Sequence, residues 1–323
     1  MRTEDAGISC TRRSIADRYF AGIDGGGTST EACVTDNQGR ILGNGRGGPS
    51  NVYYGGESQL ASSVRAALGQ ALDAADLTMT DLSSICAALA GAGRENDQAR
   101  IRKTLAPLAG DIPLLVVEDT RSALAAAHGG RNGMAIIAGT GSNCIGVKDG
   151  KYASAGGWGA LLGDEGSAYR IAVLGLRAAI KSHEKRAEAS CLMEPFMEAL
   201  GAEKPGDFIG LIHGMDRSQI AGLSRVVFIG ASSGDAVSKA ILDGEARELA
   251  LMASSVSHAL DLDAPSVALV GGCLKNPLYV EMLRYHAENM LPGVSFCRPA
   301  LRPCEGAAFL ARDAWPQYPK EGD

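Results

Sequence analysis

The sequence predicts an α/β protein built from two similar domains, and three observations support this fold class. The chain has 323 residues, which is more than one hydrophobic core normally serves. Strand and helix patterns alternate through much of it, which indicates parallel strands covered by helices. A strand, a glycine-rich turn and a second strand occur twice, at AGIDGGGTST and at IIAGTGSNCI. This repeat predicts two copies of one structural unit, and the cleft expected between them is the usual place for a ligand.

The first domain is predicted to open with an antiparallel meander. Apolar and β-branched runs separated by turn residues indicate three strands, over residues 19–23, 28–35 and 40–45. Apolar residues then recur with helical spacing and predict a helix over 57–75. The remaining elements alternate: a strand over 84–89, a helix over 94–107, a strand over 112–117 and a helix over 120–128. We expect residues 1–17 to be a loose extension before the first strand.

The second domain is predicted to repeat this opening after residues 128–133. Three strands are expected, over 134–138, 142–147 and 152–155. Mostly helices follow across 166–260, before a strand over 267–270 and a helix over 277–291. A last helix begins near Glu305 and is assigned to the first domain. The predicted domains are therefore 1–129 together with about 305–323, and 130–304.

Composition excludes several classes of function. The net charge is −6 and no basic cluster occurs, which argues against a nucleic-acid partner. No apolar run has membrane-spanning length, so no membrane partner is expected, and Arg12-Arg13 lacks the apolar segment of a twin-arginine signal. Eight cysteines without a C-x-x-C pair are typical of reduced core residues in a cytoplasmic protein. A zinc or iron–sulfur site is not expected.

Two glycine-rich turns have the composition of phosphate-binding loops. The first is Asp24-Gly25-Gly26-Gly27-Thr28, and the second is Gly139-Thr140-Gly141-Ser142-Asn143. Glycines let backbone N–H groups approach an anion, and the hydroxyl groups add donors. Asp24 could hold Mg²⁺, because hard cations prefer carboxylate oxygens. Either turn alone could be an ordinary hairpin, but two at matching places in two halves favour a clamp on a polyphosphate.

A carboxylate follows the strand predicted over 112–117. Asp119 stands where this strand meets the next helix, so it could accept the proton of a hydroxyl group during phosphoryl transfer. It could equally cap the helix that begins at Thr120, since Asp is a favoured N-cap residue. The two roles are compatible, and both stay open.

A third glycine-rich stretch has the composition of a sugar site. It contains Trp158 between glycines, followed by Asp164 and Glu165. Carboxylates accept hydrogen bonds from sugar hydroxyls, and an indole offers a flat face to ring C–H groups. A buried tryptophan and an acidic pair at a helix N-terminus explain the same residues. Gly271-Gly272, after an apolar strand, would let an adenine or ribose lie against the backbone.

Two further motifs compete with this interpretation. Gly43-x-Gly45-x-x-Gly48 matches the dinucleotide-binding pattern, but Pro49 follows and no helix starts there. Gly230-Ala231-Ser232-Ser233-Gly234 follows the apolar run VVFI and matches the nucleophile elbow of serine hydrolases. A hydrolase would leave the paired glycine turns unexplained, and no P-loop motif is present.

Taken together, five segments resemble the N-acetylglucosamine kinase family, within the wider BadF/BadG/BcrA/BcrD ATPase group. They are IDGGGTST, VVEDTRSALAAA, IIAGTGSNCIG, GGWGALLGDEGSAY and VALVGG. The resemblance runs from about Tyr19 to the last helix and is weaker through 180–225. It implies two ribonuclease H-like domains of the actin-like ATPase type flanking an active-site cleft, with ATP and Mg²⁺ as cofactors. It also implies transfer to the 6-hydroxyl of an amino sugar, and usually a homodimer.

The resemblance also implies roles for individual residues. The family's catalytic aspartate matches Asp119, and its phosphate loops match Gly25–Thr28 and Gly139–Ser142. Its adenosine-side glycines look like Gly271 and Gly272. Its sugar-side positions are similar to Asn51, Gly91, Asn143, Trp158 and Asp164.

One departure from the family pattern concerns the sugar. Animal members carry Ser-Gly-Gly where this chain has Ala90-Gly91-Ala92, so a hydroxyl near the sugar is lost. N-acetylglucosamine is therefore the first expectation and glucosamine the alternative. An ATPase activator of the same group is a third possibility, but its cluster-binding cysteines have no counterpart in the cysteine spacing here.

Overall fold

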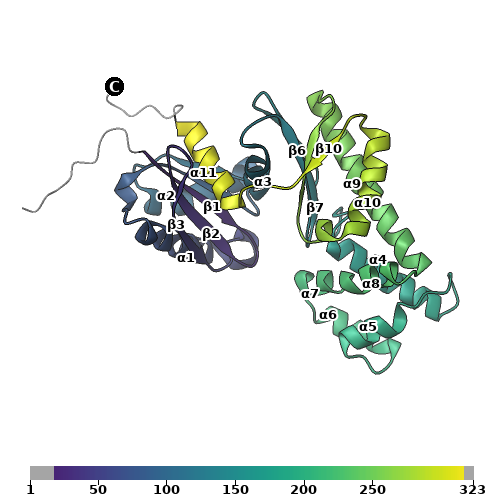
Figure 1. Cartoon of the computed structure of the whole chain (residues 1–323). Helices are drawn as coiled ribbons and strands as arrows, with labels where there is room; N and C mark the ends of the chain where they lie inside the picture. Colours follow the sequence, from purple (N-terminus) through teal and green to yellow (C-terminus); the bar gives the residue numbers. More distant parts are fainter. Residues whose placement is uncertain (1–17, 316–323) are drawn as a thin grey trace, which may run out of the picture. The chain divides into compact units, whose positions relative to one another are not determined.

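The computed structural model describes residues 18–315, and they form two compact units (Figure 1). The first unit holds the described residues up to Ser122 together with those from Pro303 onward. The second unit is Ala123–Arg302. The extension expected over residues 1–17 lies outside the described residues.

The first unit is built on a five-stranded mixed sheet with the order β3-β2-β1-β4-β5. Its strands are β1 (Tyr19–Gly25), β2 (Thr30–Asp36), β3 (Ile41–Gly47), β4 (Leu82–Leu89) and β5 (Leu114–Val117). The first three pair antiparallel, and β4 and β5 continue the sheet in parallel with β1. The predicted meander followed by parallel strands is therefore confirmed.

Helices cover both faces of this sheet, and strand alternation decides which residues meet them. Ala21 and Ile23 pack in a core with α1 (Val52–Ala74) and α2 (Glu95–Ala109). Gly22, between them, points to the other face, where α11 (Pro303–Ala314) lies. A Cβ at Gly22 would stand 2.0 Å from the Cys304 carbonyl oxygen, so only glycine lets this helix approach so closely.

Every second residue of β3 from Gly43 to Gly47 is a glycine, and these glycines allow α1 to approach closely. A Cβ at Gly43, Gly45 or Gly47 would lie 2.0–2.1 Å from a backbone carbonyl oxygen of α1. This stripe accounts for two of the three glycines of the dinucleotide-like pattern. They serve helix-to-strand packing, so the interpretation as a nucleotide loop is not needed.

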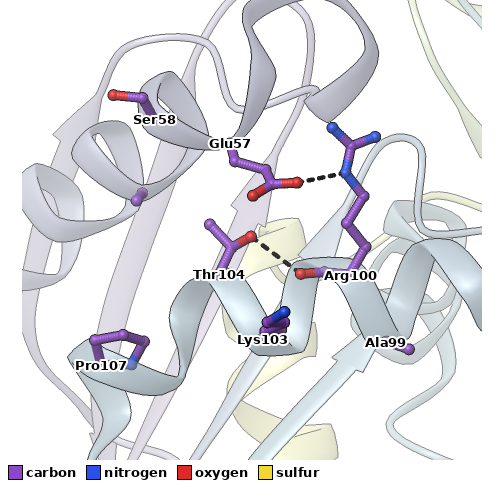
Figure 2. Close-up of a pocket in the computed structure, with 8 residues that line it drawn as sticks. Glu57, Ser58, Ala99, Arg100, Lys103, Thr104 and Pro107 are labelled. Atoms are coloured by element: carbon purple, nitrogen blue, oxygen red, sulfur yellow. Dashed lines mark hydrogen bonds and ion pairs between the residues drawn. The ribbon is translucent and has the colours of Figure 1, made fainter.

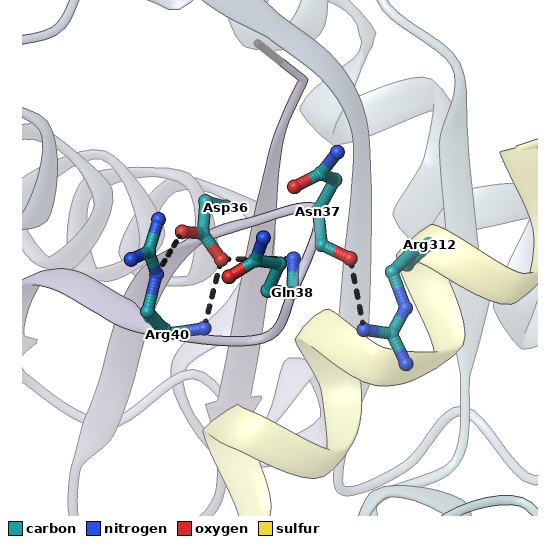
Figure 3. A network of polar contacts seen from close by, with 5 residues as sticks. All are labelled: Asp36, Asn37, Gln38, Arg40 and Arg312. Atoms are coloured by element: carbon teal, nitrogen blue, oxygen red, sulfur yellow. Dashed lines mark hydrogen bonds and ion pairs between the residues drawn. The ribbon is translucent and has the colours of Figure 1, made fainter. Parts of the chain in front are cut away.

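The turn from β2 to β3 is held by one carboxylate (Figure 3). Asp36 accepts hydrogen bonds from the backbone N–H groups of Gln38 and Arg40, and its other oxygen accepts from Arg40 Nε at 2.6 Å. These bonds hold the pKa of Asp36 below its usual value, against the effect of desolvation. Arg312 of α11 donates to the Asn37 carbonyl, which ties the last helix to the same turn.

The second unit repeats the sheet of the first. Its order is β8-β7-β6-β9-β10, with the first three strands antiparallel and the last two parallel to β6. The strands are β6 (Gly133–Ala138), β7 (Ser142–Lys148), β8 (Lys151–Gly156), β9 (Ser266–Val270) and β10 (Ser295–Cys297). The duplication expected from the two glycine-rich openings is confirmed. The short strand β10 was not predicted.

The helices of the second unit lie mostly between β8 and β9. They are α4 (Ala168–His183), α5 (Met193–Leu200), α6 (Phe208–His213), α7 (Arg217–Gly222), α8 (Ser224–Ser232) and α9 (Ala236–Leu260), with α10 (Pro277–Met290) after β9. Met134, Ile136 and Leu269 on one sheet face join their main core. The opposite face packs on Leu124 of α3 (Asp119–His128), the helix in which the chain passes from one unit to the next.

The serine-hydrolase motif lies between two of these helices. The apolar run before Gly230 belongs to α8 rather than to a strand, and Asp235 is the N-cap of α9. A nucleophile elbow needs a strand-to-helix turn, so the hydrolase interpretation fails.

Among residues 18–315, no single helix is long and apolar enough to cross a membrane. The bent pair of segments Arg217–Ser232 and Ala236–Leu260, at 117°, meets the criteria only by length and composition.

Candidate functional site

The first glycine-rich loop lies at the edge of the first unit's sheet where β1 and β4 both end. Gly26 N–H donates to the Ser29 carbonyl at 3.0 Å, and the Gly26 carbonyl accepts from Ser50. A Cβ at Gly25 would meet Ser50 Oγ at 2.1 Å, so packing requires this glycine. A Cβ at Gly26 or Gly27 would meet nothing within 4 Å. These two glycines therefore border open space, as backbone that receives a ligand would.

Asp24 and Asp119 are joined through one serine of α3. Ser122 Oγ lies 2.9 Å from Asp24 Oδ1 and 2.7 Å from the Asp119 carbonyl oxygen. A hydroxyl has a single proton, so Ser122 can donate to only one of them at a time. When Asp24 is protonated it can donate to Ser122, which then donates to the Asp119 backbone carbonyl oxygen.

Both carboxyl groups are harder to ionise than in water. Burial raises the pKa of Asp24 to about 7, aided by the charges of Asp119 and Glu31 and opposed by the Ser122 hydrogen bond. Burial likewise raises the pKa of Asp119 to about 6, and the neighbouring Glu118 charge adds to it. Such values near neutrality are typical of groups that exchange protons or bind cations.

Asn51, Tyr53 and Gly91 lie together in the first unit. Asn51 is the N-cap of α1, and its Oδ1 accepts from the Tyr53 N–H at 2.9 Å. Gly91 has φ = 93°, and a Cβ there would lie 3.1 Å from the Tyr53 ring and 3.4 Å from Asn51 Oδ1. Tyr53 is 57% exposed. The capping bond leaves both amide donors of Asn51 for a ligand, beside an exposed aromatic ring.

The second glycine-rich turn joins β6 to β7 in the second unit. Gly139 donates to the Gly141 carbonyl at 2.9 Å and accepts from the Ala168 N–H at the start of α4. Gly271 has φ = 103°, and a Cβ there would lie 2.3 Å from the Ala138 carbonyl oxygen. The Gly271 turn therefore passes directly against the strand that leads into this hairpin. Thr140 and Gly272 are exposed, and neither is held inside the core.

Asn143 offers an unused acceptor near this hairpin. Its Oδ1 is buried without a hydrogen-bond partner, and its Nδ2 would be 2.9 Å from a Cβ at Gly157. Buried polar atoms are normally satisfied, so this oxygen is a plausible ligand contact. Ser142 Oγ is used internally, donating to the Glu165 carbonyl at 2.6 Å.

Asp164 is the most buried carboxylate of the candidate site, at 2% exposure. Its φ is 63°, it accepts from the Ser142 backbone N–H, and it forms an ion pair with Arg217 of α7. Burial raises its pKa, and the Arg217 charge opposes that rise. A Cβ at Gly141 would lie 2.6 Å from Arg217 Nη2 and 3.2 Å from Asp164 Oδ1, so the pair touches the hairpin.

Trp158 is exposed rather than buried. Its exposed fraction is 71%, and Leu161 in the same loop reaches 93%. The interpretation of Trp158 as a core residue is therefore wrong, and the indole is available to a ligand.

Each unit gathers its own group of predicted site residues. The first unit holds Asp24 to Thr28, Asn51, Gly91 and Asp119, and the second holds Gly139 to Asn143, Trp158, Asp164, Gly271 and Gly272. Sequence reasoning did not include Tyr53, Ser122 or Arg217. Ser122 could have been found, because it lies one helical turn from Asp119. Arg217 could not, because it is 53 residues from Asp164 in a segment without a motif.

An open groove of about 660 Å³ between α1 and α2 is separate from these groups (Figure 2). Glu57 Oε1 lies 2.7 Å from Arg100 Nε, and Thr104 donates to the Arg100 carbonyl. None of the predicted site residues lines this groove. Among the residues that the structure describes, no group of three or more His, Cys, Asp and Glu side chains could hold a metal ion by itself.

Two sheets of identical topology, each with a glycine-rich hairpin after its first strand, define the ribonuclease H-like fold of actin-like ATPases. Residues 21–311 match the BadF/BadG/BcrA/BcrD ATPase family, and the chain belongs to this family. It is 34% identical to the N-acetylmuramic acid/N-acetylglucosamine kinase of Clostridium acetobutylicum, over 91% of this chain and 98% of the relative.

A second relative and a solved structure extend the comparison. The chain is 37% identical to the glucosamine kinase GspK of Vibrio cholerae, over 49% of this chain and 52% of that protein. It is similar in structure to a Chromobacterium violaceum protein provisionally assigned as an N-acetylglucosamine kinase. That match has a TM-score of 0.72 and 25% identity, and covers 91% of this chain and 99% of the other.

Proposed function

We propose that the protein is an ATP-dependent kinase that phosphorylates the 6-hydroxyl of an amino sugar, with N-acetylglucosamine as the preferred substrate. The observation that carries this proposal is the Asp24–Ser122–Asp119 link beside the open Gly26–Gly27 backbone. Two carboxyl groups with raised pKa values beside glycine backbone that borders open space suit phosphoryl transfer to a hydroxyl.

The nucleotide is assigned to the glycine-rich turns. Gly25–Thr28 and Gly139–Ser142 bind its phosphates, and Gly271–Gly272 receives the adenosine. Asp24 would hold Mg²⁺, which supplies charge neutralisation to the phosphates when bound. The residues fit that role, because a buried carboxylate whose charge is poorly solvated gains from a nearby cation.

The sugar is assigned to three polar and two aromatic residues. Asn51 donates from its free amide group, and the exposed rings of Tyr53 and Trp158 offer faces to apolar C–H groups. Asp164 and Asn143 accept from sugar hydroxyl or amide groups. The unpartnered Asn143 oxygen and the fixed Asp164 carboxylate support this assignment.

Asp119 acts as the base in this proposal. It orients the 6-hydroxyl and takes its proton while the hydroxyl oxygen bonds to the γ-phosphorus. The bond between that phosphorus and the bridging oxygen of ADP breaks, leaving a sugar 6-phosphate and ADP. Exclusion of water around the reacting groups keeps ATP from hydrolysis.

Glucosamine is the second candidate substrate. The residue at position 90, an alanine without a hydroxyl group, supports this alternative. Ala90 donates its backbone N–H to Gly25 and offers no side-chain hydroxyl next to Gly91. A hydroxyl that could contact the sugar is therefore missing on this side.

The test is a coupled ADP-release assay with Mg-ATP and a panel of sugars. N-acetylglucosamine, glucosamine, N-acetylmannosamine, N-acetylmuramic acid and glucose are compared by kcat/KM. Turnover of one or more amino sugars, with N-acetylglucosamine first, supports the proposal. If none of the five sugars is phosphorylated and none changes the rate of ATP hydrolysis, an ATPase activator is favoured instead.

Replacing the proposed base provides a second test. Asp119→Asn keeps the size of the side chain but cannot take a proton, so kcat should fall by roughly 10²–10⁴. ATP binding, followed by calorimetry, should change less than threefold. Asp111→Asn, on an exposed turn, is the matched control. Full activity of Asp119→Asn would remove this residue from the mechanism.

We also propose a cytoplasmic homodimer. The seven cysteines within the described residues form no disulfide, as a reducing compartment favours. Light scattering after size exclusion measures the assembly, and a monomer mass would reject the dimer.

A further inference from the structure

The ion pair between Arg217 and Asp164 connects three elements of the second unit. Arg217 is the first residue of α7, whose own start is fixed by the Asp216–Gln219 capping box. Its side chain reaches across to Asp164, in the loop before α4, and both groups lie against Gly141 of the β6–β7 hairpin. The helix end does not need Arg217 as a cap, so the arginine is free to serve this contact.

The two partners differ strongly in exposure. The Asp164 side chain is 3% exposed, whereas that of Arg217 is 34% exposed. Arg217 Nε is buried without a hydrogen-bond partner, and the guanidinium carbon lies 5.9 Å from the centroid of the Tyr169 ring. A buried carboxylate with one charged partner is held in a single orientation, while the open side of the guanidinium still reaches solvent.

We propose that Arg217 is a positioning residue that holds the Asp164 carboxylate against the Gly139–Ser142 hairpin, where it receives the sugar hydroxyls. The proposal rests on the sugar kinase function above. Asp164 accepts from the Ser142 N–H on one side and from Arg217 on the other. The same hairpin is assigned to the nucleotide phosphates. Arg217 thereby fixes the distance between the sugar-binding carboxylate and the loop that holds the phosphate.

A competing role for Arg217 is direct contact with a phosphate. Its Nη2 lies beside Gly141, so this alternative has to be separated by measurement. A residue that acts through Asp164 should affect the sugar, and its loss should add little once Asp164 is changed. A phosphate ligand should affect ATP, and its loss should add fully to the change at Asp164.

The experiment is a double-variant cycle on the full chain, with KM and kcat measured for each substrate separately. The variants are Arg217→Met, Arg217→Lys, Asp164→Asn and the double variant Asp164→Asn/Arg217→Met. The control is Arg225→Met, on the exposed side of α8. Thermal unfolding of each variant is recorded, so that a folding defect is recognised.

We expect Arg217→Met to raise the sugar KM at least tenfold while the ATP KM changes less than threefold. Arg217→Lys keeps the charge without the planar fork and should recover part of the loss. The double variant should be within threefold of Asp164→Asn alone. If Arg217→Met does not fold, the lysine variant carries the same comparison, with a smaller effect.

Three results would overturn the proposal. An ATP KM raised tenfold with an unchanged sugar KM would make Arg217 a phosphate ligand. Fully additive effects in the double variant would separate Arg217 from Asp164. Wild-type kinetics in both arginine variants would leave the arginine without a role. These results differ from a failure of the proposed function. In that case the wild-type protein itself would phosphorylate no amino sugar.

Discussion

Burial raises the pKa of both Asp24 and Asp119, and the Asp119 charge adds to the rise at Asp24. Ser122 lies between Asp24 and the Asp119 backbone carbonyl and can donate to only one of them at a time. The protein thus holds two carboxyl groups that ionise near neutral pH, one assigned to the cation and the other to the proton of the sugar. Their different surroundings support that division: Asp24 has the serine hydroxyl, while Asp119 accepts from backbone N–H groups at the start of α3.

The pH dependence of the reaction should report Asp119. A base must be ionised, and the pKa of Asp119 is about 6 without ligands. We expect kcat/KM to fall as pH decreases through 6, approaching tenfold per pH unit below it. Glu118→Gln removes a charge that raises this pKa, so the fall should move to lower pH. A flat profile between pH 5 and 8, or a shift to higher pH in the variant, would contradict the assignment.

The pH dependence of the stability of the ligand-free protein should reflect the ionisation of Asp24. Its pKa is 3.8 when unfolded and about 7 when folded, so the folded state binds more protons between these values. The free energy of unfolding therefore decreases as pH rises from 4 to 7, by roughly 2–4 kcal/mol at most from this group. Urea unfolding at pH 5 and pH 8, without Mg²⁺ or nucleotide, should show a smaller decrease in Asp24→Asn. If the free energy of unfolding decreases equally in both proteins, Asp24 does not have the raised pKa.

Some site residues could be predicted from the sequence and others could not. Asp24 and Asp119 were noticed because each follows a recognisable apolar strand. Tyr53 stands two positions after Asn51, but nothing in the sequence shows that Gly91 comes close to it. Arg217 meets Asp164 only through tertiary packing of α7. Local patterns indicate which residues end a strand, whereas contacts between distant segments depend on how the helices pack.

At the scale of elements, close packing between β3 and α1 depends on residues without side chains. Gly43, Gly45 and Gly47 all face the carbonyl groups of α1. The strand and helix backbones therefore approach more closely than any residue with a Cβ would allow. The same arrangement recurs where Gly22 meets α11.

Two glycine-to-alanine changes should have opposite effects on stability. Gly45→Ala puts a methyl group 2.0 Å from the Ala67 carbonyl oxygen and should reduce the free energy of unfolding by roughly 2–3 kcal/mol. Gly69→Ala, inside α1 with nothing within 4 Å, should raise it by about 0.5–1 kcal/mol. Urea unfolding measures both. A neutral Gly45→Ala would show that the β3–α1 spacing adjusts easily.

The order of elements was largely predictable, and the misses have physical causes. Apolar and β-branched runs bounded by turn residues located nine of the ten strands among residues 18–315. The exception, β10, has only three residues, none of them fully buried, so no pattern exists to detect. The helix predicted over 57–75 begins earlier, at Val52, because a first turn precedes a break at Gly56 with φ = 70°. That turn is fixed by the Asn51 cap, which periodicity does not show.

At the scale of the whole molecule, the two units share one sheet topology. Each sheet brings a glycine-rich hairpin to the same end of its first strand. The sequence predicted this duplication because both hairpins kept their composition. The helices expected across 166–260 are confirmed between β8 and β9, although the first unit has the long helix α1 at the matching place.

Sugar and nucleotide should bind cooperatively, because the Gly139–Ser142 hairpin assigned to the phosphates lies against the Asp164 carboxylate assigned to the sugar. The first ligand to bind would then lower the ordering cost of the second. Calorimetry should give a sugar Kd at least fivefold lower with a non-hydrolysable ATP analogue present. AMP, which lacks the terminal phosphates, is the control and should leave the Kd unchanged. Independent binding would show that the hairpin does not couple the two ligands.

The last described helix, α11, covers one face of the sheet that contains β1. Gly22, Cys33 and Ser84 on that face meet Cys304, Ala308 and Ala311, more than 200 residues later. During synthesis on the ribosome, this face of the nascent domain stays uncovered until residues 303–314 have left the exit tunnel, whereas the second unit is already complete in sequence by then. The first unit would thus be the last to mature, and until α11 covers it, this sheet face would be a natural substrate for a chaperone that shields apolar sheets.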